Sequence, residues 1–383
     1  MAKRRKVALV YQYNENWIGG TYYIENLVKA LMRLPKCNRP FLYALTEKEE
    51  DYAKLQHIAG DTGIVKGSFF KKHNILKQVI NRISNKLSQK NLFGYHRSGI
   101  NVLFPADINN HNIPGVENLY WIPDFQEHYL PDLFSKEEIA NRKQYQQEIA
   151  NKGKYIVFSS EVAKKHFNEI YPKSDIKQFV LPFAVSHSGI EAVDEVIVKY
   201  KLPANFYICS NQFWRHKNHK IILNALALLK QKGIDVHVAF TGKEYDFRYP
   251  DYFDEIKNLV AESGIEANVS FLGFIERNDQ LALMQKAIAV IQPSLFEGWG
   301  TVIEDAKSLG ATVLASDIEV HREQLEFYGA AQFFNPSEPS SLKECLLAKD
   351  IYSKLGNSDY NINVLKFGET FSSIIESIME EKN

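Results

Sequence analysis

Short apolar runs alternate along this chain with longer stretches in which apolar residues recur every three or four positions. A short apolar run is typical of a buried strand, whereas the wider spacing predicts amphipathic helices, for example at Lys220–Lys230 and Phe253–Ala261. Regular alternation of the two indicates parallel sheets covered by helices on both faces. The predicted strands are Val7–Tyr11, Asn101–Phe104, Leu119–Ile122, Tyr155–Phe158, Phe179–Leu181, Phe206–Cys209, Val236–Phe240, Val269–Leu272, Ile288–Ile291, Thr312–Ala315 and Gln332–Phe334.

The predicted strands fall into two groups, separated by the polar stretch Ser186–Glu191. At 383 residues the chain is also too long for one ordinary hydrophobic core. We therefore predict two α/β domains, residues 1–185 and 186–365, followed by an amphipathic helix over residues 366–383. Ligands of such sheets bind beyond the carboxyl ends of the strands, so we expect chemistry in the loops that leave each strand.

Charge is balanced over the whole chain but not between its halves. The formal net charge is +0, which does not indicate bulk attraction to nucleic acid. Residues 1–185 hold 27 Lys and Arg against 18 Asp and Glu, whereas residues 186–383 hold 19 against 28. The first half, at +9, is therefore expected to meet an anionic partner.

The segment Lys66–Arg97 contains eight Lys and Arg and no acidic residue. Its apolar residues recur at helical spacing, and two interpretations of it stay open. A basic amphipathic helix can lie on an anionic membrane surface, or it can pack on its own domain with a solvated basic face. The apolar residues concerned are Leu76, Ile80, Ile83 and Leu87.

Cysteine usage and hydropathy bear on the compartment. The three cysteines have no CxxC spacing, which excludes a disulfide scaffold and a structural zinc site. The apolar run Val7–Val10 is too short for the core of a signal peptide, and no stretch approaches the ~18–20 apolar residues that cross a bilayer. We expect a cytoplasmic protein that neither spans the membrane nor is secreted by that route.

The most informative stretch is residues 293–310. A strand is predicted to end near Pro293 and a helix to begin near Thr301. Glycines let the backbone approach a ligand closely, and free N–H groups at a helix start attract anions or hydroxyl oxygens. Carboxylates beside such groups can hold a polyhydroxylated ligand. The candidate residues are Glu297, Gly298, Trp299, Gly300, Thr301, Glu304 and Asp305.

This stretch resembles the signature E-G-F-G-L-P-x-x-E-A-x-A-x-G of retaining nucleotide-sugar glycosyltransferases, the family 4 type with a GT-B fold. Glu297-Gly-Trp-Gly matches its start, and Ala306 and Gly310 fix the register, so the second acid falls on Asp305 and not on Glu304. In the family the first Glu hydrogen-bonds the donor sugar and the second binds the ribose. The resemblance implies these roles for Glu297 and for Asp305, which is one methylene shorter.

A second motif follows the predicted strand Phe206–Cys209. Lys217-Asn218 matches the end of the family pattern G-x-L-x-x-x-K-[GN], in which the Lys and an Arg five residues earlier hold the diphosphate. Gln212 stands at the arginine position, so the pair is incomplete, and Arg215 is the nearest candidate for the second cation. An Arg or Lys compensates the charge of a departing diphosphate without a metal. Asn211, in the same loop, is a further candidate contact.

Two loops of the first half match the family less closely. Gly19 and Gly20 lie in the loop after the first strand, where the family has a glycine-rich loop near the donor phosphate. In Trp121–Pro131 the family's His is replaced by Pro123, while Asp124 keeps the acid; His128 either substitutes for that His or is structural. Lesser matches that the resemblance places near the nucleotide are Gly242, Phe274 and Ile275.

The resemblance implies two Rossmann-like domains that face each other across a cleft, with the last helix crossing back to the first domain. The second domain would bind the nucleotide and the first the acceptor. We expect transfer of a hexose with retention, by front-face displacement in which the leaving phosphate helps deprotonate the acceptor. No Asp-x-Asp motif is evident, so neither a metal nor a cofactor besides the nucleotide sugar is expected.

The expected acceptor is a glycan or lipid-linked hydroxyl in surface polysaccharide synthesis, at the inner face of a bacterial membrane. Two other functions stay open. Because Gln212 and Pro123 depart from the family pattern, the chain could be a catalytically silent subunit that binds nucleotide sugars. It could also be a nucleotide-sugar hydrolase or epimerase of the same fold.

Overall fold

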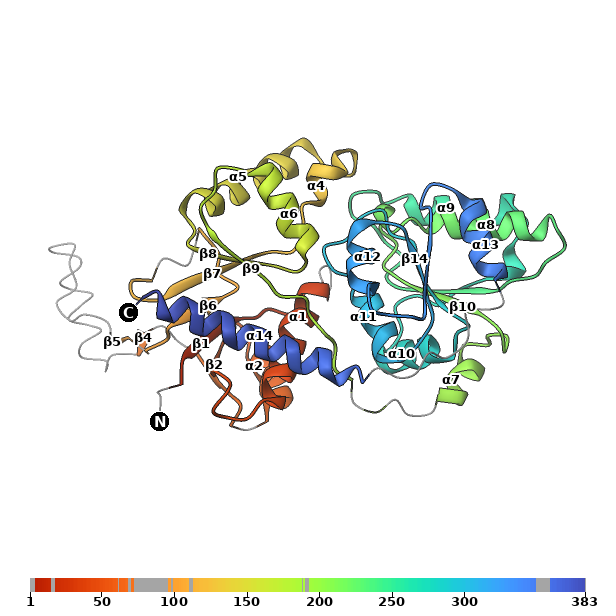
Figure 1. The fold of residues 1–383 in the computed structure, drawn as a ribbon. Helices are drawn as coiled ribbons and strands as arrows, with labels where there is room; N and C mark the ends of the chain where they lie inside the picture. The colour runs from red at the N-terminus through yellow and green to blue at the C-terminus, as the bar shows by residue number, and fades with distance from the viewer. Residues whose placement is uncertain are drawn as a thin grey trace.

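The computed structural model describes residues 4–14, 18–60, 62–67, 70–71, 96–97, 99–109, 113–187, 189, 193–348 and 359–382. Two α/β domains lie side by side, the first in red to yellow-green and the second in green to blue (Figure 1). Each domain has a sheet in which every neighbouring pair of strands is parallel. The sequence prediction of a two-domain, parallel α/β fold is thus confirmed.

The sheet of the first domain has the strand order β3-β2-β1-β6-β7-β8-β9. Its central strands are apolar runs; all four residues of β8 are buried, as expected for strands covered on both faces. The strands are β1 (Lys6–Val10), β2 (Phe41–Leu45), β3 (Ile64–Lys66), β6 (Val102–Phe104), β7 (Glu117–Ile122), β8 (Tyr155–Phe158) and β9 (Lys177–Val180). The helices are α1 (Ile18–Arg33), α2 (Glu49–Ala59), α4 (Gln126–Tyr129), α5 (Lys136–Lys152) and α6 (Glu161–Ile170).

The sheet of the second domain has the order β12-β11-β10-β13-β14-β15. Its strands are β10 (Tyr207–Ser210), β11 (Val238–Thr241), β12 (Val269–Phe271), β13 (Val290–Gln292), β14 (Val313–Ser316) and β15 (Ala331–Phe334). Its helices are α7 (Val193–Lys199), α8 (His219–Lys230), α9 (Tyr252–Glu262), α10 (Arg277–Lys286), α11 (Thr301–Ser308), α12 (Glu319–Leu325) and α13 (Pro339–Leu347). All the predicted strands of both domains overlap observed ones, whereas β2 and β3 were not predicted.

The last helix, α14 (Asn361–Glu380), begins five residues before the predicted position and lies across the first domain (Figure 1). It packs on α1, where a Cβ on Gly368 would come 2.9 Å from the carbonyl oxygen of Ala30. Its buried apolar side joins the core of the first domain and consists of Val364, Phe367, Phe371, Ile374, Ile375, Ile378 and Met379. The chain therefore crosses between the domains twice, once after β9 and once before α14.

The two domains also touch directly at two places. Glu323 of α12 accepts hydrogen bonds from the backbone N–H groups of Glu161 (2.8 Å) and Val162 (3.0 Å), and so caps the N-terminus of α6 in the other domain. At the second place the guanidinium of Arg248 lies 4.3 Å from the ring of Phe134, and its Nε donates to Glu138 (3.2 Å). Both contacts connect the two domains across the cleft.

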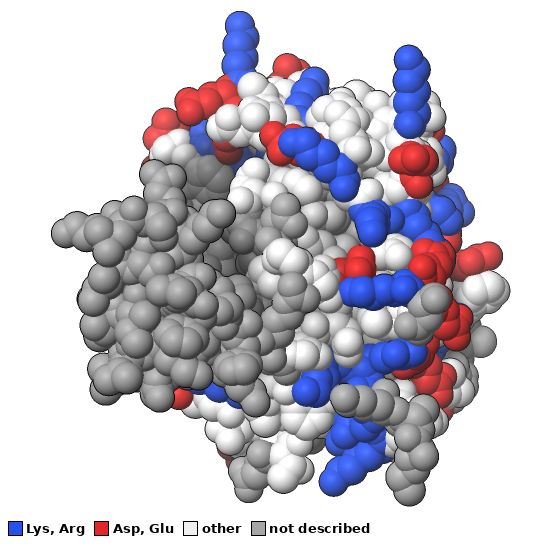
Figure 2. All heavy atoms as spheres, turned by 90° about the vertical axis from the view of Figure 1, so that its left-hand side faces the viewer, with Lys and Arg blue, Asp and Glu red and all other residues white. Residues whose placement is uncertain are grey.

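The basic segment Lys66–Arg97 lies outside the described residues apart from Lys66, Gly67 and the short antiparallel strands β4 (Phe70–Lys71) and β5 (His96–Arg97). Figure 2 shows the end of the first domain where these strands and both chain termini lie (Figure 1). Described Lys and Arg side chains there are interspersed with acidic ones, and Arg5 pairs with Glu376 (3.0 Å) and Lys382 with Glu117 (2.8 Å). Binding to an anionic surface stays a prediction from the sequence.

Candidate active site

A cavity of about 430 Å³ lies between the two domains, at the carboxyl ends of strands from both sheets. Most of the residues predicted from the sequence line it, although they come from six separate loops and helix starts. Two predicted residues, Arg215 and His128, lie outside its wall. Those that line it are Gly19, Gly20, Asp124, Asn211, Lys217, Gly242, Phe274, Ile275, Glu297, Gly298, Trp299, Gly300, Thr301 and Asp305.

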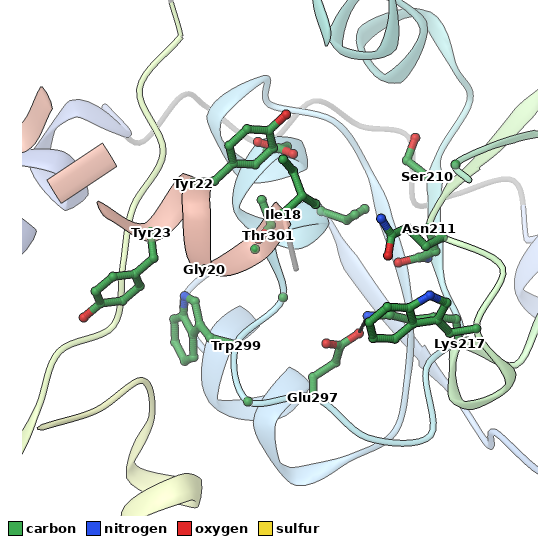
Figure 3. A pocket seen from close by; sticks show the side chains of 18 of the residues that line it. Ile18, Gly20, Tyr22, Tyr23, Ser210, Asn211, Lys217, Glu297, Trp299 and Thr301 are labelled. Carbon is green, nitrogen blue, oxygen red and sulfur yellow. Dashed lines mark hydrogen bonds and ion pairs between the residues drawn. The ribbon is translucent and has the colours of Figure 1, made fainter. Parts of the chain in front are cut away.

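The first turns of α1 and α11 lie next to each other in the wall of this cavity. A Cβ built on Gly19 would lie 4.0 Å from the hydroxyl oxygen of Thr301, so the two helix starts are in close proximity (Figure 3). Helix N-termini present unsatisfied N–H groups and the positive end of the helix dipole. Two of them converging from different domains make a site suited to an anion such as a diphosphate.

Glu297 and Lys217 form a largely buried ion pair in another part of the wall, and Figure 3 shows their side chains pointing toward each other. The Nζ of Lys217 lies 2.5 Å from Oε1 of Glu297, which also accepts a hydrogen bond from Nε2 of Gln292 (2.9 Å). Burial raises the pKa of Glu297, but Lys217 and the nearby His216 outweigh it and bring the pKa to about 2. Glu297 is therefore ionised at every physiological pH.

The local backbone explains why Asn follows Lys217. Lys217 ends a 3₁₀ turn (Arg215–Lys217), and Asn218 has φ 54° and ψ 39°, in the left-handed region. Gly and Asn adopt this conformation more readily than other residues. The turn that precedes it directs Arg215 outward, where its guanidinium lies over the ring of Tyr249 at 4.7 Å. Arg215 is exposed and does not replace the arginine missing at Gln212.

Asp305, and not Glu304, faces the cavity, in agreement with the register of the sequence motif. Glu304 is tied instead to Lys307 (2.8 Å) and to the hydroxyl of Tyr360 (2.5 Å). Asp305 is fully buried and contacts two residues that were not predicted from the sequence. Its Oδ1 accepts from Nη2 of Arg277 (2.5 Å) and lies 3.1 Å from Nε2 of His187.

The loop after β7 brings the first domain against the glycine loop of the second. A Cβ on Gly298 would lie 2.1 Å from the carbonyl oxygen of Pro123, so only glycine permits this approach. Asp124 lines the cavity, and burial raises its pKa, offset in part by the backbone N–H of Gln126. His128 is exposed and packs edge-on against Tyr129, with ring centroids 5.1 Å apart, so it does not substitute for the missing histidine.

The remaining wall carries the other weaker matches. Gly242 has φ 142°, and a Cβ there would lie 2.1 Å from the carbonyl oxygen of Asn211. The side chain of Asn211 is held by a hydrogen bond from its Nδ2 to Oε1 of Gln292 (3.0 Å). Phe274, 66% exposed, and Ile275 follow β12 and offer an apolar surface at the cavity. Such a surface suits a planar base.

Among the residues that the structure describes, no group of three His, Cys, Asp or Glu side chains is placed to hold a metal ion. Within the same described ranges, no helix is long and apolar enough to cross a membrane.

The sequence profile of the family "Glycosyl transferases group 1" matches residues 194–348, which include β10 to α13 and the motifs around Lys217 and Glu297. The O-antigen chain mannosyltransferase RfbU of Salmonella typhimurium is 23% identical over 239 residues. That alignment spans 62% of this chain and 62% of RfbU.

Solved structures share the fold over nearly the whole chain. A glycosyltransferase from Rickettsia africae superposes with a TM-score of 0.66 at 15% identity, over 98% of this chain and 99% of its own. HepE of Anabaena, solved with UDP and glucose, gives 0.64 at 15% identity over 99% of both chains. We conclude that the chain carries a glycosyltransferase group 1 domain over residues 194–348, within the two-domain GT-B fold.

Proposed function

We propose that this protein is a retaining glycosyltransferase that moves a hexosyl group from a nucleotide sugar to a hydroxyl of a glycan or lipid-linked acceptor. The observation that carries the proposal is the cavity itself, in which two helix N-termini, a lysine, the fully buried Asp305 and the largely buried Glu297 converge. Cation and N–H groups suit a diphosphate, and carboxylates suit the hydroxyls on either side of it. Both domains contribute residues to the cavity, so donor and acceptor can bind on opposite sides of it.

The phosphate end of the site lies between α1, α11 and Lys217. As the glycosidic bond breaks, negative charge accumulates on the leaving diphosphate, and fixed donors there stabilise the transition state. Lys217 is paired with Glu297 in the structure, so a bound diphosphate would offer this ammonium group a second anion. Glu297 would then accept hydrogen bonds from the hydroxyls of the transferred sugar.

The acceptor end lies on the first domain. Trp121, Asp124, Gln126 and Ser159 line that side of the cavity, next to the Glu297 loop. We place the acceptor hydroxyl there, with the leaving phosphate oxygen taking its proton on the same face of the sugar, which retains the configuration of the anomeric carbon. The reaction would need no metal, so chelators such as EDTA should leave the rate unchanged.

The test is direct. Purified protein is incubated with a panel of nucleotide sugars and with membrane glycolipid extracts, and released nucleoside diphosphate and glycosylated lipid are measured. GDP-mannose belongs in the panel because RfbU is named a mannosyltransferase. The proposal predicts turnover of one donor and, by NMR, a product with the anomeric configuration of that donor. An inverted product would contradict retention, and the absence of any turnover would contradict transfer.

A second candidate function rests on a specific observation. Gln212 and Pro123, where the family pattern has arginine and histidine, both line the cavity, so the site lacks two of the usual polar groups. A catalytically silent subunit would bind nucleotide sugars without turnover. Donor hydrolysis in the absence of acceptor distinguishes the two functions, because an active enzyme releases nucleoside diphosphate slowly and a silent subunit releases none.

We further propose that the protein acts in surface polysaccharide synthesis on the cytoplasmic side of the membrane and associates with its anionic surface. The name of RfbU, an O-antigen enzyme, and the basic Lys66–Arg97 sequence support this setting.

A further inference from the structure

The two carboxylate oxygens of Asp305 differ in their hydrogen-bond partners. The residue is fully buried in the cavity wall. Oδ1 is held by Arg277 at 2.5 Å and by His187 at 3.1 Å, whereas Oδ2, also buried, accepts no hydrogen bond from any described residue. A buried carboxylate oxygen without a donor is costly. Either an internal water or a hydroxyl of the ligand has to supply the missing donor.

The position of Asp305 indicates which part of a ligand supplies that donor. It lies four residues after Thr301, about 6 Å along α11 from the helix start that faces the phosphates. Glu297 lies on the other side of Thr301, beside Lys217. The apolar residues Phe274 and Ile275 stand three and two positions before Arg277, which contacts Asp305, so the base belongs on the Asp305 side. The group between phosphate and base is a ribose.

Arg277 begins α10 and lines the cavity beside Asp305. Its guanidinium is fixed by three contacts: Asp305, the side chain of Gln280 (2.7 Å), and the ring of Tyr22 from the other domain at 5.2 Å. Burial raises the pKa of Asp305, but Arg277 and His187 lower it further than burial raises it. A fixed guanidinium keeps a short carboxylate both ionised and oriented.

We propose that Arg277, supported by His187, is a positioning residue that holds Asp305 so that Oδ2 accepts the ribose hydroxyls of a nucleoside diphosphate. The inference rests on the proposed function, since it presumes a nucleotide in this cavity. The cation on Oδ1 fixes the side chain and leaves Oδ2 as the oxygen without a described partner.

Residues outside the second domain also help to hold Arg277 and Asp305. His187 belongs to the segment that joins the domains after β9, and Tyr22 lies on α1 of the first domain (Figure 3). Arg277 thus contacts both Asp305 and the opposing domain.

The test compares binding of ribonucleotides and dideoxyribonucleotides by calorimetry. ADP, GDP, UDP and CDP are screened with the wild-type protein, and the tightest binder is then compared with its 2′,3′-dideoxy counterpart. The wild type is expected to prefer the ribonucleotide by about tenfold or more, the effect of a hydrogen bond to a charged group. Arg277→Gln should abolish this preference by weakening the ribonucleotide alone, and Arg277→Lys, which keeps the charge, should restore part of it.

The matched control is Arg322→Gln, which breaks an exposed Arg–Asp pair with Asp317 (2.6 Å) away from the cavity and should leave both affinities unchanged. Equal weakening of both nucleotides by Arg277→Gln would show a merely structural role and overturn the inference. So would a wild type that binds ribo and dideoxy forms equally, which leaves the proposed function intact. If the wild type bound none of the four diphosphates, the proposed function would be overturned as well.

Discussion

Glu297→Gln separates two roles of the buried ion pair, because the substitution keeps the shape of the side chain and removes its charge. The side chain of Glu297 is 11% exposed and that of Lys217 17%. The pKa of Glu297 falls from 4.5 to about 2 despite burial. At 1.36 kcal/mol per unit, the folded environment favours the carboxylate by at most about 3 kcal/mol relative to the unfolded chain.

Three quantities should change differently in Glu297→Gln. Transfer should fall roughly 10–150-fold, since a charged hydrogen bond to the sugar contributes about 1.5–3 kcal/mol. Affinity for the nucleoside diphosphate should hold or rise, because Lys217 is released and a negative charge next to the phosphates is removed. The free energy of unfolding at pH 7 should fall by up to about 3 kcal/mol.

The stability loss has a defined pH dependence. A carboxyl whose folded pKa is lowered contributes its full stabilisation above its unfolded value of 4.5, and the contribution is lost as the pH falls toward about 2. The difference in unfolding free energy between wild type and Glu297→Gln should therefore be constant above pH 5 and shrink at lower pH. Urea unfolding at pH 7, 4 and 3 measures it.

Glu127→Gln provides a matched control, because Glu127 is a buried acid held by one cation and one glutamine, Arg142 (3.3 Å) and Gln146 (2.7 Å). It lies outside the cavity wall, so the variant should lose stability without changing the ratio of transfer to binding. If Glu297→Gln transfers at the wild-type rate, or if diphosphate affinity falls as far as transfer does, the reasoning is refuted.

Two more predictions concern positively charged side chains, first Lys217 and then the basic segment Lys66–Arg97. Lys217→Ala should weaken nucleoside diphosphate binding by about tenfold or more while leaving the nucleoside unaffected, since the ammonium group acts only on the phosphates; equal losses in titrations of both ligands would contradict the assignment. The protein should sediment with anionic vesicles and be released at ~0.5 M salt, because surface cations are screened within roughly 8–10 Å. Equal sedimentation with neutral vesicles would disprove this. A variant in which Gln replaces Lys71, Lys72, Lys77 and Arg82 should no longer bind the vesicles, while its rate of donor hydrolysis stays unchanged.

The fold was largely predictable because most of its central strands, such as β6, β8, β11 and β13, are buried on both faces and appear as short apolar runs. Such a run also marks Phe41–Leu45, the missed strand β2, so that strand was within reach of the same argument. The three-residue β3 was not, because a run this short has no period to detect. The start of α14 was placed late, since its first turn, with Ile362 and Leu365 exposed, shows no one-sided apolar pattern.

Some residues of the candidate site could likewise be predicted from the sequence, and others could not. Glu297, Asp305 and Lys217 could be found because each lies in a local motif whose spacing follows from one strand, one loop and one helix start. Arg277 and His187 belong to other elements, and nothing local to their sequence indicates that they meet at Asp305. The side-chain directions of Arg215 and His128 depend on the short turns that carry them, which spacing does not specify.

The close contact between Gly298 and the backbone of Pro123 offers a way to hold the two domains farther apart. Its neighbour across the cleft is the backbone of Pro123, which cannot move aside as a side chain would, and the overlap with a new Cβ would be severe. Gly298→Ala should therefore leave each domain folded but prevent their full approach. The variant would populate the open state, visible as an increased radius of gyration in small-angle scattering, and would give experimental access to the form that admits and releases substrates.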